Sequence, residues 1–364
     1  MISSKLRQAL VVAGESVLIT LITVFAVVPF SCKITEQGIQ IISGDYVSPV
    51  LTDFTVTGKD SLKLEFSEKV TVTGYVVAKA EDTTETYGAV PCTVSVDDSG
   101  CVVNVVLEQQ MEIGQAYEFY SQVKDSAGNS LTLAVPFSGY NSRVPALMIT
   151  EVQSEGVSQN KAEAEAGTYR SEFVEVLVLK DGNLAGLELC SGYDGETKKY
   201  IFPAIEVHTG EIFIVHLRNR GNGCISELGD ELDLAYSSYT KEDVRDLWTD
   251  QEGTALGNTT DIIIIKNQAD GKLLDAVMYR ASKTQSWTKT MIDYSQLVST
   301  SGIYESGAIE NAFVTDGLTA SKTLQRTDAA AILQNVLAGQ EVTFPVSSGA
   351  HVWQVSTEVS PGTL

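Results

Sequence analysis

The stretch Leu51-Thr-Asp-Phe-Thr-Val-Thr57 decides the fold class, because apolar and polar residues alternate along it. Such alternation is typical of a strand with one face buried and the other in water. Gly58-Lys-Asp-Ser61 then supplies a turn, and Leu62-Lys-Leu-Glu-Phe66 alternates again. These segments predict two successive strands of an all-β protein.

Strand-like segments continue to residue 137. β-branched and aromatic residues, which pack well on a pleated surface, dominate Val70–Val77. Further runs bounded by turn residues follow at 93–96, 101–107, 116–123 and 131–137. Seven or so short strands separated by turns predict a β-sandwich over residues 49–140.

Two motifs in this region resemble those of bacterial Ig-like domains. Leu62–Val70 (LKLEFSEKV) is similar to an early strand of these domains, and Val123–Leu131 (VKDSAGNSL) is similar to the segment near their last strand. The resemblance implies an Ig-like sandwich for residues 49–140. Asp125 and Asn129 favour a tight turn in the second motif, and their oxygens are also candidate ligands for Ca²⁺.

Ordered segments in the second half carry another resemblance. They read ALMITEV at 146–152, EFVEVL at 172–177, NLAGLEL at 183–189, YIFP at 200–203, TGEIFIV at 209–215, DIIII at 261–265, DGKLLDAVMY at 270–279, LQR at 324–326 and SPG at 360–362. Their order resembles the lamin-tail domain, an Ig-like sandwich of nuclear lamins and of many exported bacterial proteins. The resemblance implies a second sandwich over residues 146–364, with inserts at about 222–255 and 283–322. Leu187 departs from the family pattern, which usually has Trp there.

Local patterns in the second half add two expectations. Ile262–Ile265 is a continuous apolar run, which suits a strand covered on both faces. Within the first insert a short helix is expected to begin after Thr240. Its apolar face would carry Val244, Leu247 and Trp248.

The N-terminus has the composition of an export signal. Lys5 and Arg7 precede an apolar stretch over Ser16–Ser31, and Cys32 follows at once. Sixteen residues of helix rise about 24 Å, which is less than the hydrocarbon core of a bilayer, so a permanent span is less favoured. We expect residues 1–31 to be a signal peptide, which makes the chain an N-terminal apolar signal or anchor helix followed by two Ig-like β-sandwiches in tandem.

The sequence Val-Pro-Phe-Ser-Cys at 28–32 resembles a bacterial lipobox, the motif whose cysteine is diacylated and becomes the mature N-terminus. Ser31 fits the motif, whereas Pro29 stands where an aliphatic residue is usual. The resemblance implies lipid attachment at Cys32, a tether over 32–48 and anchoring in the inner or outer membrane of a bacterial envelope. Ordinary signal cleavage and an uncleaved anchor are the alternatives.

The net charge limits the possible binding partners, and the cysteine positions limit the possible disulfides. The net charge of −22, from 47 acidic and 25 basic residues, opposes binding to nucleic acid, which depends on cations that displace counterions. The same charge also keeps an exported protein soluble. Cys92 and Cys101 flank an expected turn at 97–100, which would place Val96 opposite Cys101 and Cys92 opposite Val105. In that register the two cysteines lie too far apart for a disulfide. Cys190 and Cys224 are either a disulfide or buried free thiols.

Catalytic motifs are scarce. The three histidines, His208, His216 and His351, have no zinc-like spacing and no recognisable nucleophile beside them. Glu172 and Glu175 would point to opposite faces of a strand, which predicts surface roles and no catalytic pair. No cofactor is therefore expected.

One acidic stretch is a weak candidate for structural Ca²⁺. It contains Glu227, Asp230, Glu231 and Asp233, whose spacing in a loop could supply oxygen ligands but lacks the regular calcium-loop order. The sequence thus favours a non-catalytic envelope lipoprotein whose sandwiches bind, adhere or assemble, with the membrane and an unknown protein or matrix as partners. The alternatives are an accessory or metal-dependent hydrolytic component of an exported enzyme system, and a purely structural spacer.

Overall fold

The computed structural model describes residues 44–80, 87–154, 161–166, 170–193, 198–219, 221, 223–237, 239–250, 253 and 255–364, together with a short strand pair, β1 (Ile34–Thr35) and β2 (Gly38–Ile39). The expected leader and Cys32 lie outside the described residues. Across the described part, strands predominate over helices, and no helix combines the length and apolarity that a membrane crossing requires.

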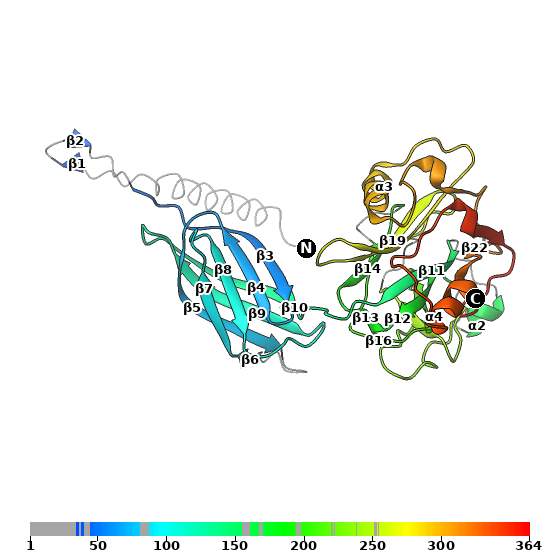
Figure 1. The fold of residues 1–364 in the computed structure, drawn as a ribbon, viewed down its shortest axis with the longest axis horizontal. Helices are drawn as coiled ribbons and strands as arrows, with labels where there is room; N and C mark the ends of the chain where they lie inside the picture. The colour runs from blue at the N-terminus through cyan, green and yellow to red at the C-terminus, as the bar shows by residue number, and fades with distance from the viewer. Residues whose placement is uncertain are drawn as a thin grey trace, which may run out of the picture.

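Residues 44–140, here called the first lobe, form a sandwich-like pair of antiparallel sheets (Figure 1). One sheet has the order β3-β4-β8-β7 and the other has the order β10-β9-β5-β6. The strands are β3 (Leu51–Gly58), β4 (Ser61–Phe66), β5 (Thr71–Ala80), β6 (Tyr87–Val90), β7 (Cys92–Val96), β8 (Val102–Leu107), β9 (Ala116–Lys124) and β10 (Ser130–Ser138).

Alternation along the strands builds the core of the first lobe. In β4 every second residue is buried, and Leu62 and Leu64 face a core that also contains Val105 and Phe119. The predicted strands over 51–57 and 62–66 are confirmed, and they pair antiparallel. β6 is an additional strand that polarity patterns did not predict.

The hairpin β7–β8 has a different register from the expected one. Cys92 lies opposite Leu107 and Val96 lies opposite Val103, because the turn at 97–100 is closed by the Asp97 carboxylate, which accepts hydrogen bonds from Gly100 N and Val102 N. None of the cysteines that the structure describes, Cys92, Cys101, Cys190 and Cys224, forms a disulfide.

Residues 146–364, the second lobe, pair a six-stranded sheet with a five-stranded one (Figure 1). The first has the order β18-β17-β12-β11-β22-β23, the second has the order β15-β14-β19-β20-β21, and β13 pairs with β16. The strands are β11 (Ala146–Gln153), β12 (Phe173–Lys180), β13 (Gly182–Asn183), β14 (Leu187–Ser191), β15 (Tyr200–Ile201), β16 (Glu206–Val207), β17 (Ile212–His216), β18 (Arg245–Trp248), β19 (Asp261–Asn267), β20 (Leu273–Arg280), β21 (Phe313–Val314), β22 (Thr323–Arg326) and β23 (Trp353–Ser356).

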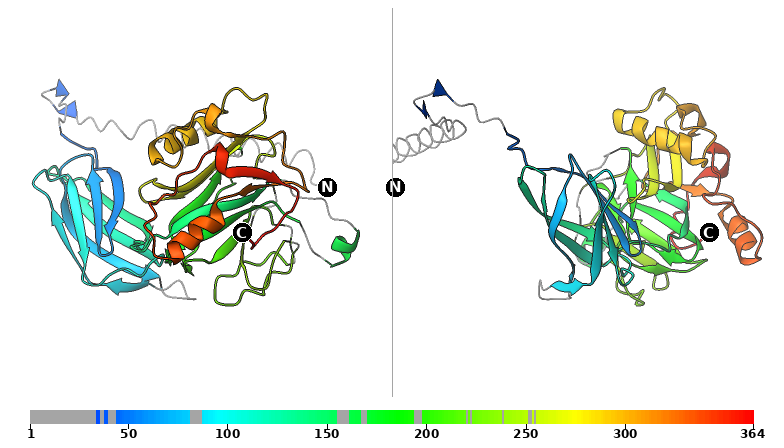
Figure 2. Two further views of the ribbon diagram at one scale, coloured as in Figure 1. Left: turned by 45° about the vertical axis from the view of Figure 1, so that its right-hand side comes forward. Right: turned by 60° about the vertical axis from the view of Figure 1, so that its left-hand side comes forward.

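Helices explain why central strands of the second lobe are buried on both faces. α3 (Lys289–Ser301) packs Met291, Tyr294 and Val298 against the outer face of the five-stranded sheet. α4 (Ala329–Leu337) packs against the outer face of the six-stranded sheet, where Leu177 and Leu179 lie. Figure 2 shows the two helices on separate sides of the sheets. The remaining helical pieces are α2 (Lys161–Ala166), η2 (Ile309–Asn311) and η3 (Ala350–Val352).

The expected covering of Ile262–Ile265 on both faces is confirmed. Ile263 and Ile265 belong to the core between the sheets, whereas Ile262 and Ile264 face α3. The double covering removes the polar alternation that an exposed face would require.

The helix expected after Thr240 is absent from the described residues, and β18 stands there. This strand runs parallel to β17, with Phe213 opposite Arg245 and His216 opposite Trp248. The prediction was wrong because the side chains at 245–248 find separate buried environments on the two faces of the sheet, and a helix would place Leu247 and Trp248 together. Tertiary packing therefore overrides the local periodicity.

Candidate functional site

The acidic stretch that was a weak candidate for Ca²⁺ is divided between surface and interior. Asp230, Glu231 and Asp233 are exposed in the loop that precedes β18 and do not converge. Glu227 is buried, and its carboxylate accepts hydrogen bonds from Leu234 N (3.0 Å), Ala235 N (3.1 Å) and Asp246 N (2.7 Å). Glu227 therefore holds its own loop against β18, which leaves the three exposed acids without a common centre.

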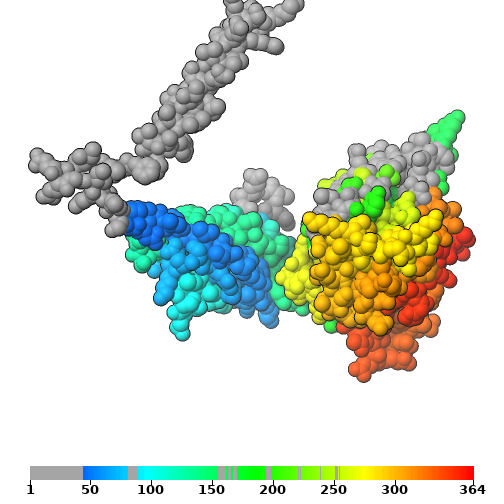
Figure 3. Space-filling model, turned by 90° about the horizontal axis from the view of Figure 1, so that it is seen from above, coloured from blue at the N-terminus to red at the C-terminus, as the bar shows by residue number. Residues whose placement is uncertain are grey.

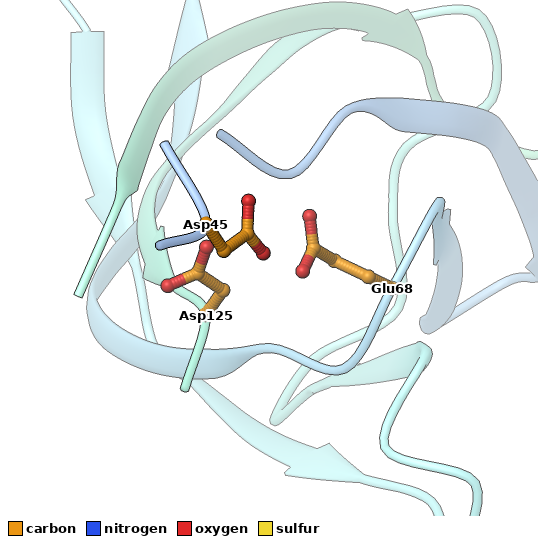
Figure 4. Close-up of side chains that lie close together, drawn as sticks. All are labelled: Asp45, Glu68 and Asp125. Atoms are coloured by element: carbon orange, nitrogen blue, oxygen red, sulfur yellow. The ribbon is translucent and has the colours of Figure 1, made fainter. Parts of the chain in front are cut away.

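Another acidic group forms in the first lobe, from the segment before β3 and the loops after β4 and β9. The carboxylates of Asp45, Glu68 and Asp125 all lie within 4.8 Å of one another (Figure 4), and within the described ranges no other acid, histidine or cysteine group of this size occurs. Glu68 and Asp125 come from the two motifs that resemble Ig-like domains. Carboxylate oxygens in this arrangement can hold a hard divalent cation.

Asp125 also has a structural role in this group. Its carboxylate accepts hydrogen bonds from Asn129 N (2.8 Å) and Asn129 Nδ2 (2.7 Å), and these bonds close the turn between β9 and β10. Burial raises the pKa of Asp125, but the hydrogen bonds outweigh burial and lower it overall. Burial, followed by the charges of Asp125 and Asp45, raises the pKa of Glu68. The predicted turn is confirmed, and Asn129 serves the carboxylate as a donor.

Glu172 and Glu175 are buried, so the surface role predicted for them is wrong. The Glu172 carboxyl accepts a hydrogen bond from Ala255 N (2.5 Å), and burial raises its pKa to about 8. The Glu175 carboxyl accepts one from Thr150 Oγ1 (2.6 Å) and one from Gly362 N (2.5 Å), and burial raises its pKa to about 7. The alternation rule failed because loops and the C-terminal segment cover what would be the solvent face of the sheet.

Two buried aspartates complete this set of carboxyl groups. Asp261 accepts hydrogen bonds from Ser191 Oγ, Gly257 N and Tyr193 N, and burial raises its pKa to about 6. Asp275 accepts a bond from Ile149 N (2.6 Å) and lies 3.9 Å from Arg326; burial again raises the pKa to about 6.

These four carboxyl groups share one property. Shifts of this size often mark catalytic acids and bases. Here each group is enclosed and receives at least one backbone amide from another strand, a loop or the chain end. We therefore assign Glu172, Glu175, Asp261 and Asp275 to the framework of the second lobe.

His216 lies in a buried polar contact of the same kind. Its Nε2 is 2.7 Å from Asp246 Oδ1, and its ring stacks on Trp248 with centroids 3.8 Å apart and planes 9° apart. All three residues are buried. The Ser226 hydroxyl donates to Trp248 O (3.1 Å) and accepts from Trp248 N (2.8 Å), so it is engaged by the backbone of β18. His208 and His351 are exposed elsewhere.

A cavity of about 710 Å³ lies where the lobes meet. Lys59, in the turn between β3 and β4, contributes from the first lobe, and Lys180 and Lys272, at the ends of β12 and the β19–β20 hairpin, contribute from the second. Figure 3 shows the lobes as two bodies in contact at one boundary. Sequence reasoning missed this cavity, because its lining residues are far apart in the chain.

Aromatic and polar side chains complete the cavity. Tyr140 and Phe344 line it, Asn141 anchors the linker between the lobes, and Asp270 closes the hairpin by accepting a bond from Lys272 N (3.0 Å). Asn141 Nδ2 donates to the carbonyl oxygens of Asn183 (2.7 Å) and Ala185 (2.8 Å), which fixes the linker to the second lobe. The linker side of the cavity is therefore held in place by hydrogen bonds to the second lobe.

Comparison with known proteins identifies the second lobe. Residues 145–355 match the family model described as "TP_1001_2nd: protein second domain". A protein of Treponema pallidum (strain Nichols), described as uncharacterized, is 31% identical over 172 residues, which are 47% of this chain and 41% of that protein. The chain therefore spans less than half the length of this relative.

Solved structures give a weaker likeness. The N-terminal part of the bacterial S-layer protein SbsC aligns with 46% of this chain and 40% of its own at 21% identity and a TM-score of 0.24. Domains 1–6 of surface layer protein SbsC align with 61% of this chain and 39% of their own at 13% identity and the same TM-score. A TM-score this low supports no argument about fold or role.

Proposed function

The chain belongs to the family described as TP_1001_2nd, protein second domain, and on that premise we propose that it is a non-catalytic binding protein of a bacterial envelope. It is exported, held to the membrane by acyl chains on Cys32, and presents two β-sandwiches of Ig-like type, the second of lamin-tail type. Its contact surfaces are the loops, the sheet edges and the boundary between the lobes.

The leader supports export and anchoring. Two basic residues, an apolar stretch of signal-peptide length and the Ser31-Cys32 pair occur in the order that lipoprotein precursors have. Two or more acyl chains give a lasting membrane attachment, since each buried methylene contributes about 0.8 kcal/mol.

The hydrogen bonds that backbone amides donate to the buried carboxyl groups are the observation that supports a non-catalytic role. Glu172, Glu175 and Asp261 have the shifted pKa values that acid–base catalysts need, yet each accepts a hydrogen bond from a backbone amide of the frame. A group that holds a loop in this way is a poor proton carrier, because moving its proton disturbs the loop.

Intact-mass analysis of the protein extracted from its native membrane tests the anchoring. We expect a mature chain that begins at Cys32 and carries the mass of acyl groups, and a Cys32→Ser variant that leaves the membrane fraction. A chain that starts elsewhere and stays in aqueous extracts would refute the anchor.

A hydrolysis screen with added divalent metals tests the non-catalytic role on phosphate-ester and glycoside substrates. We expect no turnover above that of the buffer. Activity that disappears in the Glu231→Ala variant and persists in Glu341→Ala, an exposed acid elsewhere, would support the hydrolytic alternative and overturn the proposal.

A further inference from the structure

We propose that the cavity between the lobes binds an acidic oligosaccharide, with the ammonium groups of Lys59, Lys180 and Lys272 facing its carboxylates. This site deepens the proposed binding role and rests on it, but it does not depend on the lipid anchor.

Charge is distributed unusually at this cavity. In a chain with 25 basic residues and a net charge of −22, three lysines line one cavity and Asp270 is the acidic residue among its lining. All three lysines are exposed, and within the described ranges none of their ammonium groups pairs with a carboxylate, whereas Lys63, Lys79 and Lys266 elsewhere do. These cations are therefore available for an anion from outside.

Arg143, which neighbours the cavity wall, differs in this respect. Its guanidinium is engaged by the Glu206 carboxylate. The lysines lie on three separate turns or strand ends, so the fold brings their charges together from distant parts of the chain.

The size and lining of the cavity suit a ringed ligand. Its volume of about 710 Å³ is within the range of roughly 300–1,000 Å³ found for small-molecule sites. Tyr140 is half-buried and Phe344 is 38% exposed, so aromatic surface is offered beside the ammonium groups. Aromatic surface packs against the apolar faces of sugar rings, while lysines meet the charged substituents.

The negative net charge of the chain limits which anionic ligands can reach the cavity. Nucleic acid and other dense polyanions meet the repulsion of the whole chain before they reach three lysines. A short saccharide with one carboxylate on each ring is small enough to enter the cavity and carries charges spaced along its length. We therefore favour this class over phosphate-rich polymers.

Calorimetry with the full chain in detergent tests the proposal. The probes are tetragalacturonic acid, its fully methyl-esterified and hence neutral counterpart, and inorganic phosphate. We expect the acid to bind at least about tenfold more tightly than the ester, and its affinity to fall as salt is added, because salt screens exposed charges.

Matched variants locate the binding. Lys180→Gln combined with Lys272→Gln should weaken binding of the acid about tenfold or more, whereas Lys124→Gln, an exposed lysine at the end of β9, should leave it unchanged. Unaltered melting temperatures show that the variants remain folded. Tighter binding of phosphate than of the saccharide, equal binding of acid and ester, or no binding overturns the proposal. The intact-mass measurement tests the lipid anchor at Cys32 independently of the saccharide site. A failure of the proposed anchor can therefore be told apart from a failure of the proposed binding site.

Discussion

The two lobes bury their sheets in different ways. In the first lobe, β4 alternates between buried and half-buried residues and β9 alternates mostly between buried and exposed ones, so the outer face of each sheet is at least partly in water. In the second lobe, β12 and β19 are buried along almost their whole length, because helices and loops cover the outer faces as well.

The two lobes also differ in the polar side chains that they bury. Among the described residues, Ser121 and Asp125 are the buried polar side chains of the first lobe, and all others follow residue 145. In the second lobe the buried carboxyl groups accept hydrogen bonds from backbone amides in loops and the C-terminal segment and, at Ile149, beside a register shift of β11. Among the described residues, the covered second lobe therefore encloses many more polar groups than the first lobe.

The largest effect is expected from Asp275→Ala. This change removes the acceptor of Ile149 N and leaves the buried Arg326 guanidinium, 3.9 Å away, with less compensation. We expect a loss of about 3–5 kcal/mol in the free energy of unfolding, measured in urea. The exposed Asp53→Ala in the first lobe is the control and should cost less than about 0.5 kcal/mol. Equal losses of stability in the Asp275→Ala and Asp53→Ala variants would contradict the proposed difference between the lobes.

Leu64→Ala probes the apolar core of the first lobe. Leu64 is fully buried between the sheets, so its truncation should cost about 2–4 kcal/mol in the same assay. Val106 on β8 is 48% exposed, and Val106→Ala should cost less than about 0.5 kcal/mol. If both variants lost the same stability, the alternating pattern would not describe the packing.

Glu172→Gln should change the pH dependence of stability. The pKa of this group is about 8 when folded and ordinarily 4.5, so its contribution is fully present below pH 4.5 and is lost as pH rises towards 8. Gln does not ionise, so from pH 5 to pH 8 the variant should gain about 1–3 kcal/mol relative to the wild type. Chemical denaturation at both pH values measures this, and Glu341→Gln, at an exposed position, should show no gain.

Reduction should have the smallest effect. Since none of Cys92, Cys101, Cys190 and Cys224 forms a disulfide in the structure, dithiothreitol should shift the melting temperature of the folded lobes by less than about 1 °C. A marked drop would mean that a disulfide joins two of them.

Sequence patterns predicted what repeats along a strand. The strands at 51–57, 62–66 and 116–123 are confirmed, because one face of each sheet is open and alternation reports it. The doubly covered Ile262–Ile265 is also confirmed, since a run of four isoleucines fits no surface.

What depends on distant contacts was not predictable. Glu172 and Glu175 look like surface residues until Ala255 and Gly362 supply their donors, and β18 looks like a helix until β17 lies beside it. The cavity at the boundary joins Lys59 to residues more than a hundred positions away, so no local pattern marks it.

The framework role of the buried carboxyl groups in the second lobe predicts that burial raises their pKa values. Their titration can be followed by carbon NMR of the full chain in detergent, with ¹³C at the glutamate side-chain carboxyl and with Glu172→Gln and Glu175→Gln for assignment. We predict pKa values of about 8 for Glu172 and about 7 for Glu175. Values near 4.5 for both would show that water reaches these groups, and the proposed framework role would then be wrong.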